Sequence, residues 1–215
     1  MSLHLYYHPL SSFCWKAEIA LYENGTAFVP HIVNLMDEGE RNAFYEMWPI
    51  GKFPVLRDDR DDRIIPESSI IIEYLDQHYP GATKFIPSDP DAARQMRMRD
   101  RFYDLYLQLP MQKITADKMR PEGMHDPMGV ADARRAIETA YRMVEEDLAG
   151  KTWAMGDAFT MADCAALPAL YYADFRVPME GRFPNAQKYL ERLKARPSIA
   201  RTLKEAEPYL HMVPR

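Results

Sequence analysis

Two hydroxyls and one thiol lie close together near the start of the chain, in HPLSSFCWKAEIAL (residues 8–21): Ser11, Ser12 and Cys14. All three can do chemistry, because a hydroxyl can donate a hydrogen bond to an anion and a thiol can act as a nucleophile. The hydroxyls can instead cap a helix, since a Ser before an apolar periodic run accepts backbone N–H groups that the first turn leaves unpaired. The segment alone leaves both interpretations open.

The predicted elements place this segment where a strand turns into a helix. Residues 3–7 (LHLYY) alternate apolar side chains on one face and predict a strand. Residues 14–25 (CWKAEIALYENG) predict a helix that ends at its Asn-Gly pair. A second strand is predicted at 28–35, where Pro30 favours an edge position or a late start. The first part is completed by a short helix and turn at 42–51, strands at 53–56 and 63–66, and a helix at 68–81.

From Ser88 onward the periodic segments are helical. In residues 129–150, apolar side chains recur at steps of three or four, which is typical of an apolar stripe on a polar helix. Residues 116–129, rich in Pro, Gly and Asp, predict a loop. Other helical patterns cover 91–109, 159–175 and 185–203. We therefore expect an α/β plus all-α chain, with a βαβ-ββα unit at residues 1–80 and an all-helical bundle at residues 88–215.

Two other motifs are interpreted as structural. Thr160 and Asp163 have the Thr-x-x-Asp form of a capping box before an apolar run, and this spacing explains both residue types without a catalytic pair. The charge run at residues 57–63 (RDDRDDR) contains carboxylates that can bind a hard cation. Because its signs are mixed and it lies between two short apolar runs, it predicts a solvated hairpin loop.

Composition narrows the classes of protein. With 215 residues and 47% hydrophobic content, the chain can bury a sizeable core. The net charge of −5, without a stretch of Lys, Arg and aromatics, argues against nucleic-acid binding. The first residues have no basic start and no long apolar run, so we expect no signal peptide and no membrane span. Two widely separated cysteines and six histidines without ligand spacing predict a reducing, cytoplasmic location and no metal site.

The order of elements and four motifs together resemble the cytosolic glutathione transferase family over nearly the whole chain. The βαβ-ββα order, with Ser-x-x-Cys at the first helix and a Pro opening the third strand, is the thioredoxin-like pattern. Residues 11–16 (SSFCWK) resemble the family's Ser-containing first-helix motif and are similar to the Ser-Ser-x-x-Trp form of zeta-type members. Residues 51–56 (GKFPVL) resemble Gly-Lys-Val-Pro-Val-Leu, residues 67–71 (ESSII) resemble Glu/Gln-Ser-x-x-Ile, and residues 160–163 resemble the capping box of the helical domain.

The resemblance implies a glutathione site. Ser11 matches the Ser that hydrogen-bonds the glutathione thiolate, and at a helix N-terminus that anion is also favoured by unpaired N–H groups. Phe53 would bind the cysteinyl backbone through its main chain, followed by a cis Pro54. Lys52 would lie near the glycyl end, and Glu67 and Ser68 would hold the γ-glutamyl end, carboxylate to ammonium and hydroxyl to carboxylate. The attacking nucleophile is then glutathione, which acts as co-substrate, rather than a side chain of the protein.

Cys14 is the rival to Ser11, because a thiol in the first turn of a helix can be acidified and can form a mixed disulfide in thiol transfer. Its spacing places it on a buried helix face, however, which favours a core role, as does the apolar helix around Cys164. Ser12 is expected to help cap the helix. The zeta-like Trp15 suggests isomerisation of maleylacetoacetate-type substrates as an alternative activity, although other members carry a basic residue there.

The partners expected from the resemblance are glutathione, a hydrophobic small-molecule electrophile and a second copy of the chain in a homodimer. Members line the electrophile pocket from the first long helix of the helical domain, which carries Tyr103, Tyr106 and Met111 in this chain. Residues 48–51 (WPIG) depart from the family's Asn-Pro before the Gly-Lys turn, so a local polar contact differs. A non-catalytic module that binds ligands or a partner protein is the alternative from another class.

Overall fold

Four short strands form the sheet of the N-terminal part in a computed structural model that describes residues 2–214. They run in the order β2-β1-β3-β4, with β1 parallel to β2 and antiparallel to β3, which is antiparallel to β4. Leu5 of β1 pairs with Pro30 on one side and Leu56 on the other. The edge position of β2 therefore confirms the prediction from Pro30. The strands are β1 (Leu3–Tyr7), β2 (Val29–Ile32), β3 (Val55–Asp58) and β4 (Arg63–Pro66).

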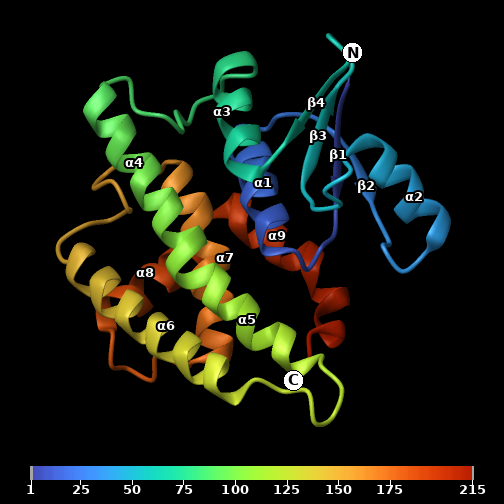
Figure 1. The fold of residues 1–215 in the computed structure, drawn as a ribbon. Coiled ribbons are helices and arrows are strands. Elements are labelled where there is room, and N and C mark those ends of the chain that lie inside the picture. The colour runs from blue at the N-terminus through green and yellow to red at the C-terminus, as the bar shows by residue number, and fades with distance from the viewer. Residues whose placement is uncertain (1, 215) are drawn as a thin grey trace.

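Three helices cover this sheet: α1 (Ser12–Glu23), α2 (Glu38–Met47) and α3 (Ser68–His78). Figure 1 shows α1 and α3 between the sheet and the helical part, with α2 on the other side, next to β2. The main core joins β1, α1 and α3 to the helical part, whereas Val33, Phe44 and Val55 form a separate small core under α2. The thioredoxin-like first unit of the predicted fold class is confirmed.

The second part is all helical, as predicted, with the chain continuing past the first helix in one long rod (Figure 1). That rod is longer than the predicted 91–109, because α4 passes through a π-helical stretch, η1, into α5, and the loop shrinks to residues 119–126. The predicted helix 185–203 is two helices, since Arg196 precedes a proline and takes an extended conformation. The elements are α4 (Pro90–Phe102), η1 (Tyr103–Gln108), α5 (Leu109–Lys118), α6 (Pro127–Asp147), α7 (Met161–Arg176), α8 (Pro184–Lys194), α9 (Pro197–Ala206) and the 3-10 helix η2 (Glu207–Met212).

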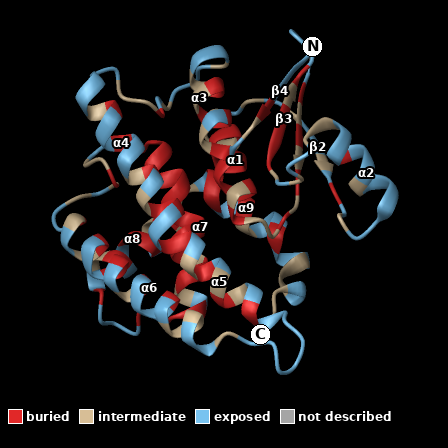
Figure 2. Ribbon diagram, viewed as in Figure 1, coloured by how far each residue is buried: buried red, intermediate tan, exposed pale blue. Residues whose placement is uncertain are grey.

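Helix α7 lies at the centre of the helical part and packs against α1, and both are largely buried (Figure 2). The capping box at its start is present: the Asp163 carboxylate accepts the Thr160 backbone N–H at 2.8 Å. The side chain of Trp15 from α1 lies against Tyr171 and Tyr172 of α7. These contacts fix the N-terminal part on the helical part.

The predicted hairpin loop joins β3 and β4, and most of its charged residues are exposed. Asp58 departs from the predicted solvated loop, because it is fully buried and accepts hydrogen bonds from the hydroxyls of Tyr74 (2.7 Å) and Tyr79 (2.5 Å). Burial opposes ionisation of this carboxyl, but the two tyrosine hydrogen bonds prevail and lower its pKa. Asp58 therefore fastens the hairpin to α3.

A buried cation also joins the two parts. The Lys16 ammonium of α1 is fully buried, donates to the Ser69 hydroxyl at 2.7 Å and pairs with Asp100 and Asp104 of the helical part. Such a charge is tolerated in the interior because its partners replace the lost hydration. Across residues 2–214, none of the helices is long and apolar enough to span a bilayer.

Candidate functional site

Ser11 is the N-cap of α1, but its hydroxyl makes no capping hydrogen bond. The main chain of Ser11 makes the hydrogen bonds at this end of the helix instead. The Ser11 carbonyl accepts the N–H groups of Cys14 (2.9 Å) and Trp15 (3.0 Å), and the Ser11 N–H donates to the His8 carbonyl at 2.9 Å. The backbone is therefore held on both sides, while the half-buried hydroxyl takes no part in capping the helix. A hydroxyl in this state can donate to a ligand at no cost to the helix.

The loop before Ser11 is fixed from two directions. The Trp15 indole N–H donates to the Pro9 carbonyl at 2.6 Å, and the Tyr172 hydroxyl of α7 donates to the Leu10 carbonyl at 2.9 Å. Ser12 does not cap the helix as expected, because it is buried and its hydroxyl accepts a hydrogen bond from the Gln108 side chain of η1. The helical part thus helps to position the first turn of α1.

The turn before β3 brings its main chain next to this helix start. Gly51 has φ +68°, and a Cβ there would lie 2.3 Å from the Tyr45 ring, so both conformation and space require glycine. Lys52 follows as an exposed cation. The Phe53–Pro54 peptide is cis, as expected. Phe53 is half-buried against the Phe44 ring.

The start of α3 is the third segment of the site, beside the start of α1 and the turn before β3. Glu67 has φ +71°, a sparsely populated conformation for a residue with a side chain, and it persists only where the surroundings impose it. The Glu67 side chain is exposed and makes no capping hydrogen bond, while Ser68 behind it is buried. Helix N-termini carry unpaired N–H groups and partial positive charge, so α1 and α3 both present anion-binding ends.

A cavity of about 340 Å³ lies between these three segments. All six residues that the resemblance assigned to glutathione line it: Ser11, Lys52, Phe53, Pro54, Glu67 and Ser68. Phe13, Gly51, Leu109 and Gln112 complete its lining. We call it the polar cleft. It combines a hydroxyl that does not cap its helix, one cation, one carboxylate and two helix N-termini, which is a set of groups that suits a small zwitterionic peptide.

A second cavity of about 340 Å³ adjoins the polar cleft and shares Ser11 and Gln112 with it. We call it the adjoining cavity. Its wall is formed by α5, the end of α7 and the chain after η2, and it includes Met111, as expected from the sequence. Its other lining residues are Leu10, Ser12, Gln108, Thr115, Ala116, Met119, Tyr172, Arg176, Met212, Val213 and Pro214.

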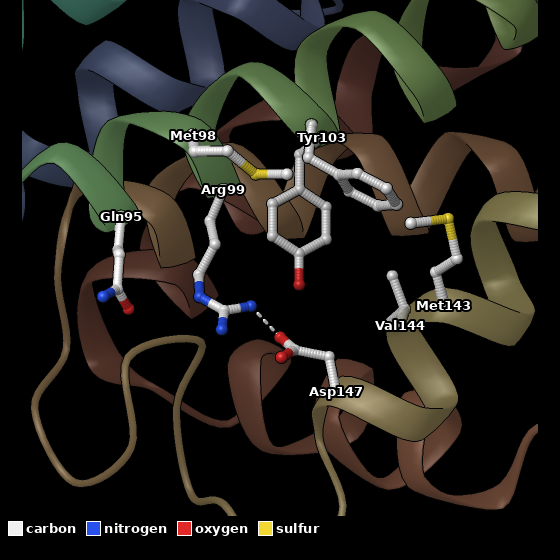
Figure 3. Close-up of a pocket in the computed structure, with 8 residues that line it drawn as sticks. Gln95, Met98, Arg99, Tyr103, Met143, Val144 and Asp147 are labelled. Carbon is white, nitrogen blue, oxygen red and sulfur yellow. Dashed lines mark hydrogen bonds and ion pairs between the residues drawn. The ribbon is translucent and has the colours of Figure 1, made fainter.

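The structure does not bring Tyr103 and Tyr106 to either cavity. Tyr103 is buried and lines a separate hollow between α4 and α6, where Figure 3 shows it with Met98, Met143 and the Arg99–Asp147 ion pair. Tyr106 is 56% exposed. Both lie in the π-helical stretch, whose i→i+5 turns rotate side chains away from the face that α-helical spacing predicts.

Neither cysteine is available for chemistry. The Cys14 and Cys164 thiols are free but fully buried. Burial raises the pKa of each thiol, and the contact of Cys14 with the Ser11 side chain offsets only part of that rise. A thiol that stays protonated and inaccessible is a poor nucleophile. The core role expected for both cysteines is the one the structure shows.

Sequence reasoning missed several residues around the site: Gln108, Gln112, Tyr172 and Arg176. Each lies in the helical part, far along the chain from the N-terminal motifs, so only tertiary packing brings it there. Gln108 and Gln112 recur four apart, which predicts a shared helix face, but nothing in the sequence shows what that face contacts. Within residues 2–214, His, Cys, Asp and Glu side chains form no group of three suited to a metal ion.

Comparison with known proteins matches both parts of the chain. The family described as "Glutathione S-transferase, N-terminal domain" matches residues 5–83, and "Glutathione S-transferase, C-terminal domain" matches residues 103–197. The probable maleylacetoacetate isomerase of Vibrio cholerae is 28% identical over 97% of this chain and 98% of its own. Glutathione S-transferase GstB of Escherichia coli K12 is 27% identical over 74% of this chain and 77% of its own.

A solved structure agrees in fold. The glutathione S-transferase from Methylobacillus flagellatus, crystallised with glutathione bound, superposes with a TM-score of 0.86 at 25% identity, covering 94% of this chain and 98% of its own. The two domain matches, the curated relatives and this superposition agree with the element order and the motifs derived above. The chain therefore belongs to the cytosolic glutathione transferase family.

Proposed function

We propose that this glutathione S-transferase joins the thiolate of glutathione to a hydrophobic electrophile. The observation that carries the proposal is the polar cleft, in which the Ser11 hydroxyl, which does not cap α1, lies in the same cavity as groups suited to both ends of the tripeptide. A thiol with a pKa near 8.5 is only slightly ionised at pH 7, and lowering that pKa by about two units needs roughly 2.7 kcal/mol of thiolate stabilisation. A hydrogen bond from Ser11, with the α1 N-terminus, is the source we assign.

The remaining residues of the cleft would place the tripeptide. The Phe53 main chain, beside cis Pro54, would bind the cysteinyl backbone. The Lys52 ammonium suits the glycyl carboxylate. At the other end, the Glu67 carboxylate suits the γ-glutamyl ammonium, and Ser68 with the α3 N-terminus suits its carboxylate. The electrophile would enter the adjoining cavity, which meets the cleft at Ser11 and Gln112, with Met111 as part of its apolar wall.

The experiment is glutathione conjugation of a neutral aromatic halide by the wild type, Ser11→Ala and Cys14→Ala. We expect Ser11→Ala to lose about a hundredfold in kcat, the scale of one hydrogen bond to a developing anion, and Cys14→Ala to retain turnover. Unchanged activity in Ser11→Ala would remove Ser11 from this role. A loss confined to Cys14→Ala would instead favour thiol transfer, in which Cys14 forms a mixed disulfide with glutathione.

Isomerisation of a maleylacetoacetate-type acid is a second candidate, which one feature of the adjoining cavity favours. Arg176 lines this cavity, and within residues 2–214 it forms no ion pair with a carboxylate. A cation there suits a carboxylate on the substrate, and the Vibrio cholerae relative carries the isomerase name. Arg176→Leu would raise the KM for an acidic substrate and spare that for a neutral one. Equal effects on both would exclude this assignment.

A homodimer is also part of the proposal. Large apolar side chains are exposed on α3 of the N-terminal part and on α4, η1 and α6 of the helical part, so both domain types offer apolar surface to a second copy: Ile70, Met98, Leu105, Tyr106 and Met143. Light scattering of the wild type should give twice the mass of the chain, and Tyr106→Glu should give the single-chain mass.

The proposal also includes a cytoplasmic location, which the two free cysteines support. Conjugation of electrophiles there would serve detoxification.

A non-catalytic binding module remains the competing reading of the same fold. Glutathione affinity without turnover across a panel of electrophiles would favour it. If calorimetry detected no glutathione binding, both glutathione proposals would fail together.

A further inference from the structure

The turn between β1 and α1, residues 8–11, carries Ser11 to the polar cleft. Pro9 occupies the second position of this turn, which suits the fixed φ of proline, and the Ser11 N–H closes the turn on the His8 carbonyl at 2.9 Å. Inside the turn, the Leu10 N–H donates to Nδ1 of the His8 ring at 3.2 Å. His8 therefore accepts both N–H groups of the turn, one through its main chain and one through its side chain.

The carbonyls of the same turn are paired with the two helices behind it. The Pro9 carbonyl accepts the Trp15 indole N–H of α1, and the Leu10 carbonyl accepts the Tyr172 hydroxyl of α7. Because proline has no N–H, the bond from Leu10 to the His8 ring completes the pairing of this main chain. Loss of that one side-chain acceptor would leave the Leu10 N–H unpaired and would free the turn to shift.

The His8 ring has to be neutral to make this contact, since a protonated imidazole donates from both of its nitrogens. Burial of the ring lowers the pKa of His8, which favours the neutral form. Nδ1 is therefore kept as an acceptor near neutral pH.

The same ring contacts the segment on the opposite side of the polar cleft. It stacks on the Phe53 ring, with ring centres 6.3 Å apart and planes at 24°, and it meets the Tyr209 ring of η2 at 6.2 Å. An acceptor for the Leu10 N–H requires only a short polar side chain, such as Asn. The aromatic ring therefore adds a second contact, which the turn by itself does not need.

His8 thus reaches two residues that flank the cysteine of glutathione in the proposed function, on which this inference rests. It holds Ser11 through the turn and Phe53 through its ring. We propose that His8 is a positioning residue, which fixes the Ser11 hydroxyl relative to the Phe53 main chain and so aligns the glutathione sulfur with its hydrogen-bond donor.

Two variants separate the two contacts of His8. His8→Asn keeps an acceptor for the Leu10 N–H and removes the ring, whereas His8→Phe keeps a ring and removes the acceptor. Ultraviolet absorbance of the thiolate against pH, at saturating glutathione, gives the pKa of the bound thiol. We expect His8→Phe to raise that pKa by about one unit, because a small misplacement of a donor weakens its bond to the sulfur. His8→Asn should keep the wild-type pKa and raise the KM for glutathione about threefold.

The matched controls are His78→Asn and His78→Phe, at an exposed histidine in the last turn of α3. Both should equal the wild type in thiol pKa and in KM. A thiol pKa that is unchanged in His8→Phe, or raised equally in His8→Phe and His8→Asn, would overturn the proposal. A wild-type complex with an unperturbed thiol pKa would instead overturn the proposed function and this proposal together.

Hydrogen exchange of the Leu10 amide, followed by nuclear magnetic resonance without glutathione, tests the turn independently of the proposed function. The amide should exchange faster in His8→Phe than in the wild type and should stay protected in His8→Asn. Denaturant unfolding of both variants shows that each is folded under the conditions of the measurement. Equal protection of Leu10 in the wild type and both variants would overturn the positioning role.

Discussion

Helices α1 and α7 begin with similar residues and use them in opposite ways. At the start of α7, the Asp163 carboxylate accepts hydrogen bonds from the Thr160 N–H, the Ala154 N–H at 2.8 Å and the Tyr189 hydroxyl at 2.6 Å. At the start of α1, the main chain of Ser11 makes the capping bonds and its hydroxyl takes no part in them. A polar group that is fully paired stabilises the fold, whereas a polar group that the fold holds but does not use is free to bind a ligand.

The same contrast holds for buried acids within the two helices. Asp163 is surrounded by donors, while the Glu18 carboxyl of α1 is 2% exposed and one of its oxygens has no hydrogen-bond partner in residues 2–214. Burial, and secondarily the charge of Glu205, raise the pKa of Glu18 to about 8. The first acid stabilises the fold by its contacts, and the second is tolerated because it stays protonated near neutral pH.

The largest expected effect is a loss of stability when Asp163, the fully hydrogen-bonded acid, is replaced. Asp163→Ala leaves several buried donors without an acceptor, so we expect the free energy of unfolding to fall by about 4 kcal/mol. The KM for glutathione of the protein that remains folded should be unchanged. Denaturant unfolding of this variant and of Asp157→Ala, an exposed control on the preceding loop, measures the difference. A similar small loss in both would mean that the capping box contributes little.

Next in size is the response of Glu18 to pH. Because its folded-state pKa lies above the ordinary value near 4.3, the unfolded chain loses this proton first, and stability falls as pH rises from about 4 to about 8. Glu18→Gln removes that loss and should exceed the wild type by on the order of 3 kcal/mol at about pH 9, with little difference at about pH 4. Unfolding curves across pH test this, with the exposed Glu146→Gln as control. Parallel curves for wild type and Glu18→Gln would contradict it.

Replacing Ser11 should have the reverse effect of replacing Asp163: it should change the glutathione site and leave the stability of the fold nearly unchanged. Ser11→Ala should raise the pKa of the glutathione thiol in the complex toward its free value, by up to about two units, because only the α1 N-terminus then stabilises the thiolate. The free energy of unfolding should change by less than about 0.5 kcal/mol. Ultraviolet absorbance of the bound thiolate against pH gives the first quantity. Ser12→Ala, which loses the buried bond to Gln108, should instead destabilise by about 1 kcal/mol. If Ser11→Ala destabilised more than Ser12→Ala, the contrast between used and unused hydroxyls would fail.

The smallest expected effect is at the start of α3. Glu67→Gln keeps the shape of the side chain but removes the charge proposed to meet the γ-glutamyl ammonium, so the KM for glutathione should rise about tenfold, or about 1.4 kcal/mol. The kcat should change little, since the ammonium lies far from the reacting sulfur. Steady-state kinetics separate the two quantities. A fall in kcat with unchanged KM would place Glu67 in thiol activation instead.

The elements that could be predicted from the sequence differ between the two parts of the chain. The strands, the edge position of β2 and the capping box at Thr160 were predictable, because each depends on residues within a few positions of one another. The cis peptide at Phe53–Pro54 was expected only from the resemblance to the family. The split between α8 and α9 was also readable from Arg196-Pro197, although periodicity alone hid it. The sequence placed Tyr103 and Tyr106 at the electrophile pocket, but neither lines the two cavities, because no local sequence pattern indicates the π-helical stretch that contains them.

The sequence by itself determined the family to which the chain belongs and, through short motifs that resemble those of the family, six of the residues that line the polar cleft: Ser11, Lys52, Phe53, Pro54, Glu67 and Ser68. Only the tertiary structure decided that the Ser11 hydroxyl does not cap α1, that Ser12 bonds to Gln108, that Cys14 is buried in the core, and that Arg176 borders the adjoining cavity. The physical reason is the separation along the chain of the residues that interact. Capping, turns and periodicity act along the chain, whereas burial, pKa and charge clustering depend on neighbours that packing brings from distant segments.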